Sequence, residues 1–211
     1  MQMDKALIFD LDGTLWDATE ELCLVWNEIF RALGIGRTLT RDDLKGIMGK
    51  TIEETADMLF PNQKREYGLR VLSQCAESHI RYLEDHGANL YEGVEEVLKE
   101  LSAEYSLYIV SNCPSGYIEA FLKAHHMAAY FNDYEMSGRT GKPKGENIRL
   151  IIERNRIRKS AYIGDTRSDE SAARNANIPF IHAAYGFGTA EKPDAVIHSF
   201  KELSEVTNTL F

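Results

Sequence analysis

Hydrophobic and polar residues form two kinds of pattern along this chain. Short apolar runs predict buried strands, and segments with an apolar residue every three or four positions predict amphipathic helices. The predicted strands span residues 6–10, 107–111, 161–164, 180–182 and 195–197, with a weaker one at 134–136. The helices predicted between them span residues 94–101, 117–124, 147–154 and 169–176. Strands that alternate with helices are typical of a parallel sheet covered by helices, so we expect an α/β fold of Rossmann type.

One long segment, from about residue 17 to residue 91, breaks this alternation because it contains helical patterns and no strand. Four helices are predicted there in series: over residues 22–33, after the capping residue Thr40, after the capping box of Thr51 and Glu54, and over residues 63–83. We therefore expect a helical cap domain at residues 17–87. It would be inserted into an α/β core domain made of residues 1–16 and 88–211.

Composition and charge narrow the class of protein. A chain of 211 residues suits one α/β domain with a smaller insertion. The net charge of −9 argues against binding nucleic acid through a basic surface. No apolar run approaches the roughly 18 residues of a membrane span, and the first strand begins too early for a signal peptide. Three cysteines without metal-ligand spacing fit a reducing compartment. We expect a cytoplasmic monomer or homodimer with no nucleic-acid or membrane partner.

Two carboxylates follow the first predicted strand. Successive side chains of a strand point to opposite faces, so Asp10 and Asp12 point the same way, at the edge where a parallel sheet binds ligands. Two like charges this close need a cation or a shared proton. The pair therefore predicts a metal site, a nucleophile beside a general acid, or both. Gly13 then permits a close backbone approach, and Thr14 offers a hydroxyl.

Further polar groups follow the later strands. Ser111 and Asn112 could donate hydrogen bonds to a phosphate, although Ser-Asn after a strand also fits a plain turn. Asp165 offers the carboxylate oxygens that Mg²⁺ prefers. Asp169 begins the next predicted helix, where it could contact the water shell of a metal, orient a lysine, or only complement the helix dipole.

Three lysines are candidates for a phosphate or substrate site. Lys142 precedes Pro143, which restricts it to extended conformations, so its charge could be held at a defined angle to neutralise a phosphoryl group. Lys144 competes with it, and we expect Lys144 to be the exposed one. Lys50 lies in a glycine-rich segment between two predicted cap helices. It either binds the leaving group or is a solvated side chain in a turn.

In their order along the chain, these motifs resemble those of the haloacid dehalogenase-like hydrolase superfamily. The matching residues are Asp10-Leu11-Asp12-Gly13-Thr14, Ser111, Lys142, and Gly164-Asp165 with Asp169. The resemblance covers essentially the whole chain. The inserted helices resemble the cap of its phosphoglycolate phosphatase-like and β-phosphoglucomutase-like members. The resemblance to this superfamily implies a Mg²⁺-dependent phosphatase that acts on a small phosphorylated metabolite.

The same resemblance implies a role for each residue. Asp10 would attack phosphorus and form an aspartyl-phosphate, and Asp12 would protonate the leaving oxygen and then activate water. Mg²⁺ would be bound by Asp10, by the backbone carbonyl of Asp12 and by Asp165, with Asp169 nearby. The phosphoryl oxygens would be held by the residues at the strand ends and by the lysine, namely Gly13, Thr14, Ser111, Asn112 and Lys142.

Alternatives remain open. Asp12 favours phosphorus chemistry, because the dehalogenases of the superfamily lack this acid. A phosphosugar mutase is a second possibility, weakened because Leu22 stands where such mutases commonly carry a histidine. A catalytically silent binding module is a third, disfavoured because the motifs are complete. Trp26 is expected on the apolar face of a cap helix, without chemistry. The segment 185–188 is either part of the pocket or a plain turn.

Overall fold

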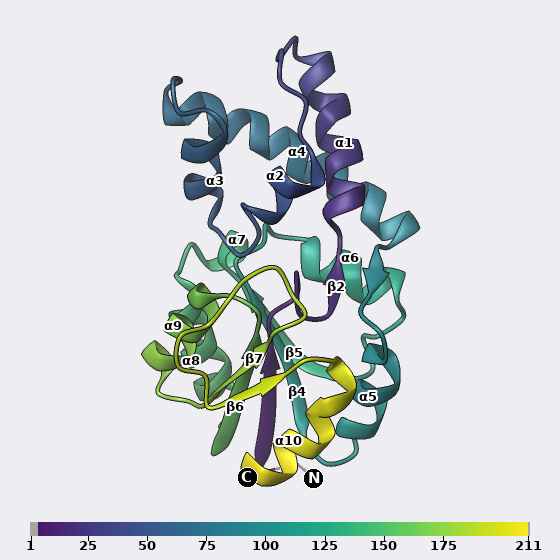
Figure 1. The fold of residues 1–211 in the computed structure, drawn as a ribbon, viewed down its shortest axis with the longest axis vertical. Helices are drawn as coiled ribbons and strands as arrows, with labels where there is room; N and C mark the ends of the chain where they lie inside the picture. Colours follow the sequence, from purple (N-terminus) through teal and green to yellow (C-terminus); the bar gives the residue numbers. More distant parts are fainter. Residues whose placement is uncertain (1–3, 211) are drawn as a thin grey trace.

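A six-stranded parallel sheet forms the centre of the computed structural model, which describes residues 4–210 (Figure 1). Residues 1–3 and 211 of the predicted core domain lie outside the described residues. The strands, in their order across the sheet, are β5 (Phe131–Met136), β4 (Ser106–Ser111), β1 (Lys5–Phe9), β6 (Lys159–Gly164), β7 (Phe180–Ala183) and β8 (Ala195–Ile197). Counted along the chain without β2 and β3, this order is that of a Rossmann fold. The predicted fold class is confirmed.

Helices cover both faces of the sheet, which explains why β1 is an uninterrupted apolar run. Ala6 and Ile8 pack with residues of α8 (Lys144–Arg154) and α9 (Arg167–Ala176) on one face. On the other face, Leu7 and Phe9 belong to the larger cluster. The core-domain helices in that cluster are α5 (Val94–Leu101), α6 (Tyr117–Ala124) and α10 (Leu203–Leu210), with the short helix η1 (Phe200–Glu202), and the cluster continues into residues 22–83. Figure 1 shows α8 and α9 on one side of the sheet and α5 and α10 on the other.

Four consecutive helices form a separate layer, in the upper half of Figure 1. They are α1 (Thr19–Ala32), α2 (Arg41–Lys45), α3 (Ile52–Leu59) and α4 (Arg65–His86), together called the helical unit. Helix α4 packs against α1 and α3 and also contacts α6 of the core. Two short strands, β2 (Trp16–Asp17) and β3 (Asn89–Leu90), pair antiparallel where the chain enters and leaves the helical unit.

Most of the predicted elements are present. Helices α5 and α6 begin and end at the predicted residues, and the capping hydrogen bonds of Thr40 and Thr51 are both formed. Strands β2 and β3 were missed because two residues are too few to show a period. Helix α7 (Ser137–Thr140) was missed because a helix of one turn is also too short to show one. Helix α10 was also not predicted. Within residues 4–210, none of the helices combines the length and the apolar composition of a membrane span.

One boundary difference affects the site. The helix predicted over residues 147–154 begins three residues earlier, at Lys144, directly after Pro143. Proline suits the start of a helix, because its ring fixes φ and its missing N–H would have no helical partner there. Lys144 is therefore a residue of the first helical turn and not part of an exposed loop.

Candidate active site

The candidate site lies at the carboxyl ends of three neighbouring strands. Asp10 follows β1, Ser111 ends β4 and Asp165 follows β6. The backbone N–H of Asp10 donates to the carbonyl of Ile163 at 2.8 Å, which continues the pairing of β1 with β6 by one residue. The order of the strands reverses between β1 and β6, and open α/β sheets bind their ligands at such a point. The sheet therefore places Asp10 and Asp165 where ligand chemistry is expected.

Three buried carboxylates meet at this point. One oxygen from each of Asp10, Asp165 and Asp169 lies within 4.8 Å of the others, and all three residues are buried. Burial, followed by the nearby charge of Asp169, raises the pKa of Asp10 to about 6. The same two causes hold the pKa of Asp165 well above its usual range. Buried like charges need compensation by a cation, so the cluster is able to hold a metal ion.

Lys144 supplies part of this compensation. Its Nζ atom lies 2.9 Å from Oδ1 of Asp10 and 2.6 Å from Oδ1 of Asp169, and the residue is 3% exposed. Burial alone would lower the pKa of Lys144, but the attraction of the two carboxylates outweighs it and raises the pKa above its ordinary value. Lys144 therefore stays charged. Oδ1 of Asp165 has no hydrogen-bond partner among the described residues.

The expectation that Lys144 is the exposed one of the two lysines is wrong. Lys142, predicted to serve the site, lies in the segment before α8 with its side chain 47% exposed, and its Nζ is 3.3 Å from a carboxylate oxygen of Glu146. Lys144, predicted to be exposed, is the buried one. The cause is the early start of α8, because the first turn of this helix carries the Lys144 side chain to Asp10. Lys142 remains in the lining of the neighbouring cavity.

Asp12 is held by two donors. Nε1 of Trp16 donates to its Oδ1 at 2.9 Å, and the hydroxyl of Tyr117 donates to the same oxygen at 2.8 Å. Burial raises the pKa of Asp12 to about 7, although the hydrogen bond from Tyr117 opposes that rise. A carboxyl group with a pKa near neutrality can give up and recover a proton easily, as a general acid and base must. Its carboxylate is not part of the cluster formed by Asp10, Asp165 and Asp169.

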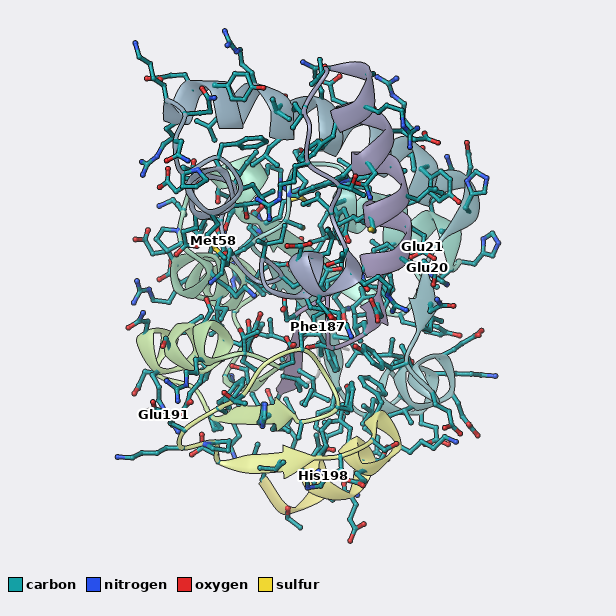
Figure 2. The ribbon with its side chains drawn as sticks, turned by 45° about the horizontal axis from the view of Figure 1, so that its top comes forward. Glu20, Glu21, Met58, Phe187, Glu191 and His198 are labelled. Carbon is teal, nitrogen blue, oxygen red and sulfur yellow. The ribbon has the colours of Figure 1, made fainter. Side chains whose placement is uncertain are left out.

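Glycines allow the backbone to pack tightly around Asp165. Gly13 has φ of +82°, and a Cβ there would lie 2.2 Å from Oδ2 of Asp165. A Cβ on Gly186 would lie 2.3 Å from the carbonyl oxygen of Gly13. The backbone N–H of Phe187 donates to Oδ2 of Asp165 at 2.7 Å. Phe187 lies on the loop after β7, near the middle of Figure 2. Segment 185–188 therefore borders the site. The group that comes close to the backbone at Gly13 is the carboxylate of Asp165.

Asp169 serves two neighbours at once. Its Oδ1 accepts from Lys144, and its Oδ2 accepts from the backbone N–H of Thr166 at 2.9 Å and from the hydroxyl of that residue at 2.6 Å. The backbone N–H of Asp169 donates in turn to the Thr166 hydroxyl, which completes a capping box at the start of α9. Asp169 is thus the member of the cluster whose two carboxylate oxygens both already accept hydrogen bonds.

The remaining predicted residues divide into two groups. Ser111 is buried and lines the cavity, and the hydroxyl of Thr14 is buried without a partner among the described residues. Asn112, in contrast, donates from its side chain to the carbonyl of Gly49 at 2.9 Å and accepts from Ser137 at 2.9 Å. The side chain of Asn112 therefore joins the helical unit to the core.

A cavity of about 730 Å³ extends from the strand ends into the helical unit. Asp10, Asp12 and Ser111 line its core end. Lys50, which is exposed, lines it as well. The apolar and aromatic residues in its lining come mainly from the helical unit and include Leu22, Trp26, Ile47, Leu72, His79, Ile80 and Tyr117. No pattern in the sequence connects Trp26 or His79 with the site, because the packing of α1 on α4 brings them to it.

Comparison with known proteins agrees with this geometry. A family model described as haloacid dehalogenase-like hydrolase matches residues 7–183. The phosphoglycolate phosphatase of Vibrio parahaemolyticus is 28% identical over 222 aligned residues, which cover 96% of this chain and 95% of that protein. The corresponding enzyme of Vibrio vulnificus is 29% identical over 223 residues, with the same coverage.

Solved structures share the fold. A haloacid dehalogenase-like family hydrolase from Streptococcus pneumoniae superposes with a TM-score of 0.83 at 22% identity, covering 96% of this chain and 97% of that one. A structure described as a predicted phosphatase from Clostridium acetobutylicum gives 0.81 at 23% identity, covering 99% and 100%. Since the family model spans most of the chain, from β1 to β7, the protein belongs to the haloacid dehalogenase-like hydrolase family.

Proposed function

We propose that the protein is a Mg²⁺-dependent phosphatase that hydrolyses a small phosphomonoester through an aspartyl-phosphate on Asp10. The observation that carries this proposal is the arrangement around Asp10. Lys144 and Asp165 both lie close to its carboxylate, and Asp12 follows two residues later in the chain, with a pKa near neutrality. The phosphoglycolate phosphatases among the relatives support phosphate ester chemistry.

Each residue has a defined part in this reaction. An oxygen of Asp10 forms a bond to phosphorus while the bond from phosphorus to the leaving oxygen breaks, and Asp12 gives its proton to that oxygen. Asp12 then takes a proton from the water that attacks the aspartyl-phosphate, which releases inorganic phosphate and restores Asp10. Lys144 offsets negative charge beside Asp10, and the hydroxyls of Ser111 and Thr14 donate to the phosphoryl oxygens.

The residues of the carboxylate cluster fit a divalent cation. Three carboxylates and one ammonium leave two uncompensated negative charges, and Oδ1 of Asp165 is buried without a partner among the described residues. Carboxylate oxygens are the ligands that Mg²⁺ prefers. We assign the direct contacts to Asp10 and Asp165, and we assign to Asp169 the positioning of Lys144, because both oxygens of Asp169 are engaged. The cation would offset the charge of the phosphoryl group.

Asp165→Asn tests the metal site without any substrate. Mg²⁺ at one hundred times its dissociation constant should stabilise the wild type by about 2.7 kcal/mol, measured by thermal denaturation against EDTA. Because ionisation of Asp165 is unfavourable in its buried site, the metal-free variant should be at least as stable as the metal-free wild type. The variant should gain little from Mg²⁺.

Asp57→Asn is the control for that measurement, because Asp57 is exposed, pairs with Arg65 and lies outside the cavity. It should respond to Mg²⁺ as the wild type does. A full Mg²⁺ response in Asp165→Asn would remove Asp165 from the ligand set.

We also propose that the helical unit, residues 17–87, acts as a cap that encloses the substrate. It supplies most of the apolar lining of the cavity, and its loop at Gly49 is hydrogen-bonded to Asn112 of the core. In this arrangement the core carries the reaction and the cap selects the leaving group. Lys50 is the cap residue expected to meet an anionic or hydroxylated group at the rim.

The test of the proposed function is phosphate release from a panel of phosphomonoesters that includes phosphoglycolate and hexose phosphates, with Mg²⁺ and with EDTA. We expect release with Mg²⁺ and none with EDTA. The same reactions are analysed for isomerised product. Isomerisation without net phosphate release would favour a mutase, and no reaction with any ester would end the phosphatase proposal.

A further inference from the structure

His79 is a buried histidine with one unmatched hydrogen-bond donor. Nε1 of Trp26 donates to its Nδ1 at 2.8 Å, so Nδ1 is an acceptor and the proton of the neutral ring lies on Nε2. Burial lowers the pKa of His79 to about 3, which keeps the ring neutral. The residue is 3% exposed, and Nε2 has no hydrogen-bond partner among the described residues. Buried donors nearly always have an acceptor, so a ligand is expected to provide one.

The surroundings of His79 indicate what kind of ligand this is. His79 lines the cavity together with the buried residues Leu22, Trp26, Leu72 and Tyr117. The charged cavity-lining residues of the cap, Lys50, Glu53 and Glu77, are all exposed. The buried lining of the cap cavity is therefore mainly apolar, with His79 and Thr55 as its polar side chains.

Tyr117 places His79 relative to the reaction centre. The ring of Tyr117 lies 5.3 Å from that of His79, centroid to centroid, and its hydroxyl donates to Asp12 at 2.8 Å. Asp12 is the residue proposed to protonate the leaving oxygen. His79 is thus one aromatic side chain beyond the leaving oxygen, on the side where the rest of the leaving group must extend.

We propose that the inner part of the cavity takes an uncharged, mainly apolar part of the leaving group, and that His79 donates a hydrogen bond from Nε2 to an acceptor oxygen on it. This inference rests on the proposed phosphatase function and adds the chemical class of the substrate. A carboxylate would be disfavoured at this position, because a buried anion needs a cation and His79 is neutral. The acceptor would instead be a carbonyl, ether or hydroxyl oxygen.

Three benzyl phosphates test this inference, with acetyl, ethyl or carboxylate at the para position. The acetyl and ethyl esters have nearly the same shape, but only the acetyl group has an acceptor oxygen. All three esters release a benzyl alcohol. For the wild type with Mg²⁺ we expect kcat/KM for the acetyl ester to exceed that for the ethyl ester by up to about tenfold, the effect of one hydrogen bond to a buried donor. The carboxylate ester should be the poorest substrate.

Two variants remove the donor in different ways. His79→Met keeps a sulfur atom that can accept weakly from Trp26 but has no donor, and His79→Phe removes both ring nitrogens. In both variants, the acetyl-to-ethyl ratio of kcat/KM should fall to about one, and this ratio is taken within each variant so that any change in its overall rate cancels. His86→Phe, at the exposed end of the same helix, should keep the wild-type ratio.

Binding of the matching benzylphosphonates, measured by calorimetry with Mg²⁺, separates the two proposals. A preference for the acetyl phosphonate that His79→Met and His79→Phe both abolish would support the role of His79 even if no ester were hydrolysed, in which case the phosphatase proposal alone fails. Hydrolysis with equal acetyl and ethyl rates, an unchanged ratio in both His79 variants, or a carboxylate ester as the best substrate would overturn the role of His79 and leave the phosphatase proposal standing.

Discussion

Asp10→Asn lowers kcat for phosphate release by about four orders of magnitude or more, the loss seen when the nucleophile of a covalent mechanism is removed. The neutral amide has nearly the shape of the carboxylate but cannot attack phosphorus. Lys144 keeps its contact with Asp169, so the fold should be preserved. The measurement is steady-state phosphate release with Mg²⁺, using the best ester of the panel, together with a thermal denaturation curve.

Asp57→Asn, the exposed control, should retain the wild-type rate. If Asp10→Asn released phosphate within tenfold of the wild type while remaining folded, Asp10 would not be the nucleophile. In that event the carboxylate cluster would have to act only as a metal site.

The second largest effect expected here is the difference in kcat/KM between the matched variants Lys144→Met and Lys142→Met. The same substitution two residues apart should lower kcat/KM by about 10²- to 10³-fold at Lys144, as the loss of a preorganised charge beside the reacting group does. At Lys142, an exposed side chain paired with Glu146, the change should stay within about threefold. Steady-state kinetics on both variants gives the comparison.

Stability must be measured with these variants, because Lys144→Met leaves two buried carboxylates without their counter-ion. Removing one partner of a buried ion pair costs about 3–5 kcal/mol, which urea denaturation in EDTA should show for Lys144→Met but not for Lys142→Met. Kinetics are therefore compared at a temperature where both variants are fully folded. A larger loss of activity at Lys142 than at Lys144 would restore the original assignment of Lys142.

The sequence predicted the core well because its signals are local. Leu7 and Ile8 point to opposite faces of the sheet, and helices cover both faces, so the strand appears in the sequence as one apolar run. The acids follow this run directly. Helix starts are less sharply encoded. Helix α8 begins three residues earlier than predicted. Lys144 therefore lies in its first turn and contacts Asp10, where the sequence had suggested Lys142.

The contacts that the sequence could not predict join residues far apart in the chain. Trp26 meets His79 across 53 positions, and Asp165 accepts from Phe187 across 22. No spacing rule links such pairs, because they depend on how α1 packs on α4 and on where the loop after β7 folds back. Trp26, taken as an apolar residue without chemistry, fixes the proton on the ring of His79 through its indole N–H.

The antiparallel pair of β2 and β3 brings together the two chain connections between the helical unit and the core. The two ends of this unit leave the core side by side, so a rotation about this two-stranded ribbon would move four helices without breaking the central sheet. Trp16 belongs to that ribbon, and its indole N–H also holds Asp12. Any change in the geometry of this ribbon would therefore also change the position of one of the two donors to Asp12, the residue proposed to carry the proton.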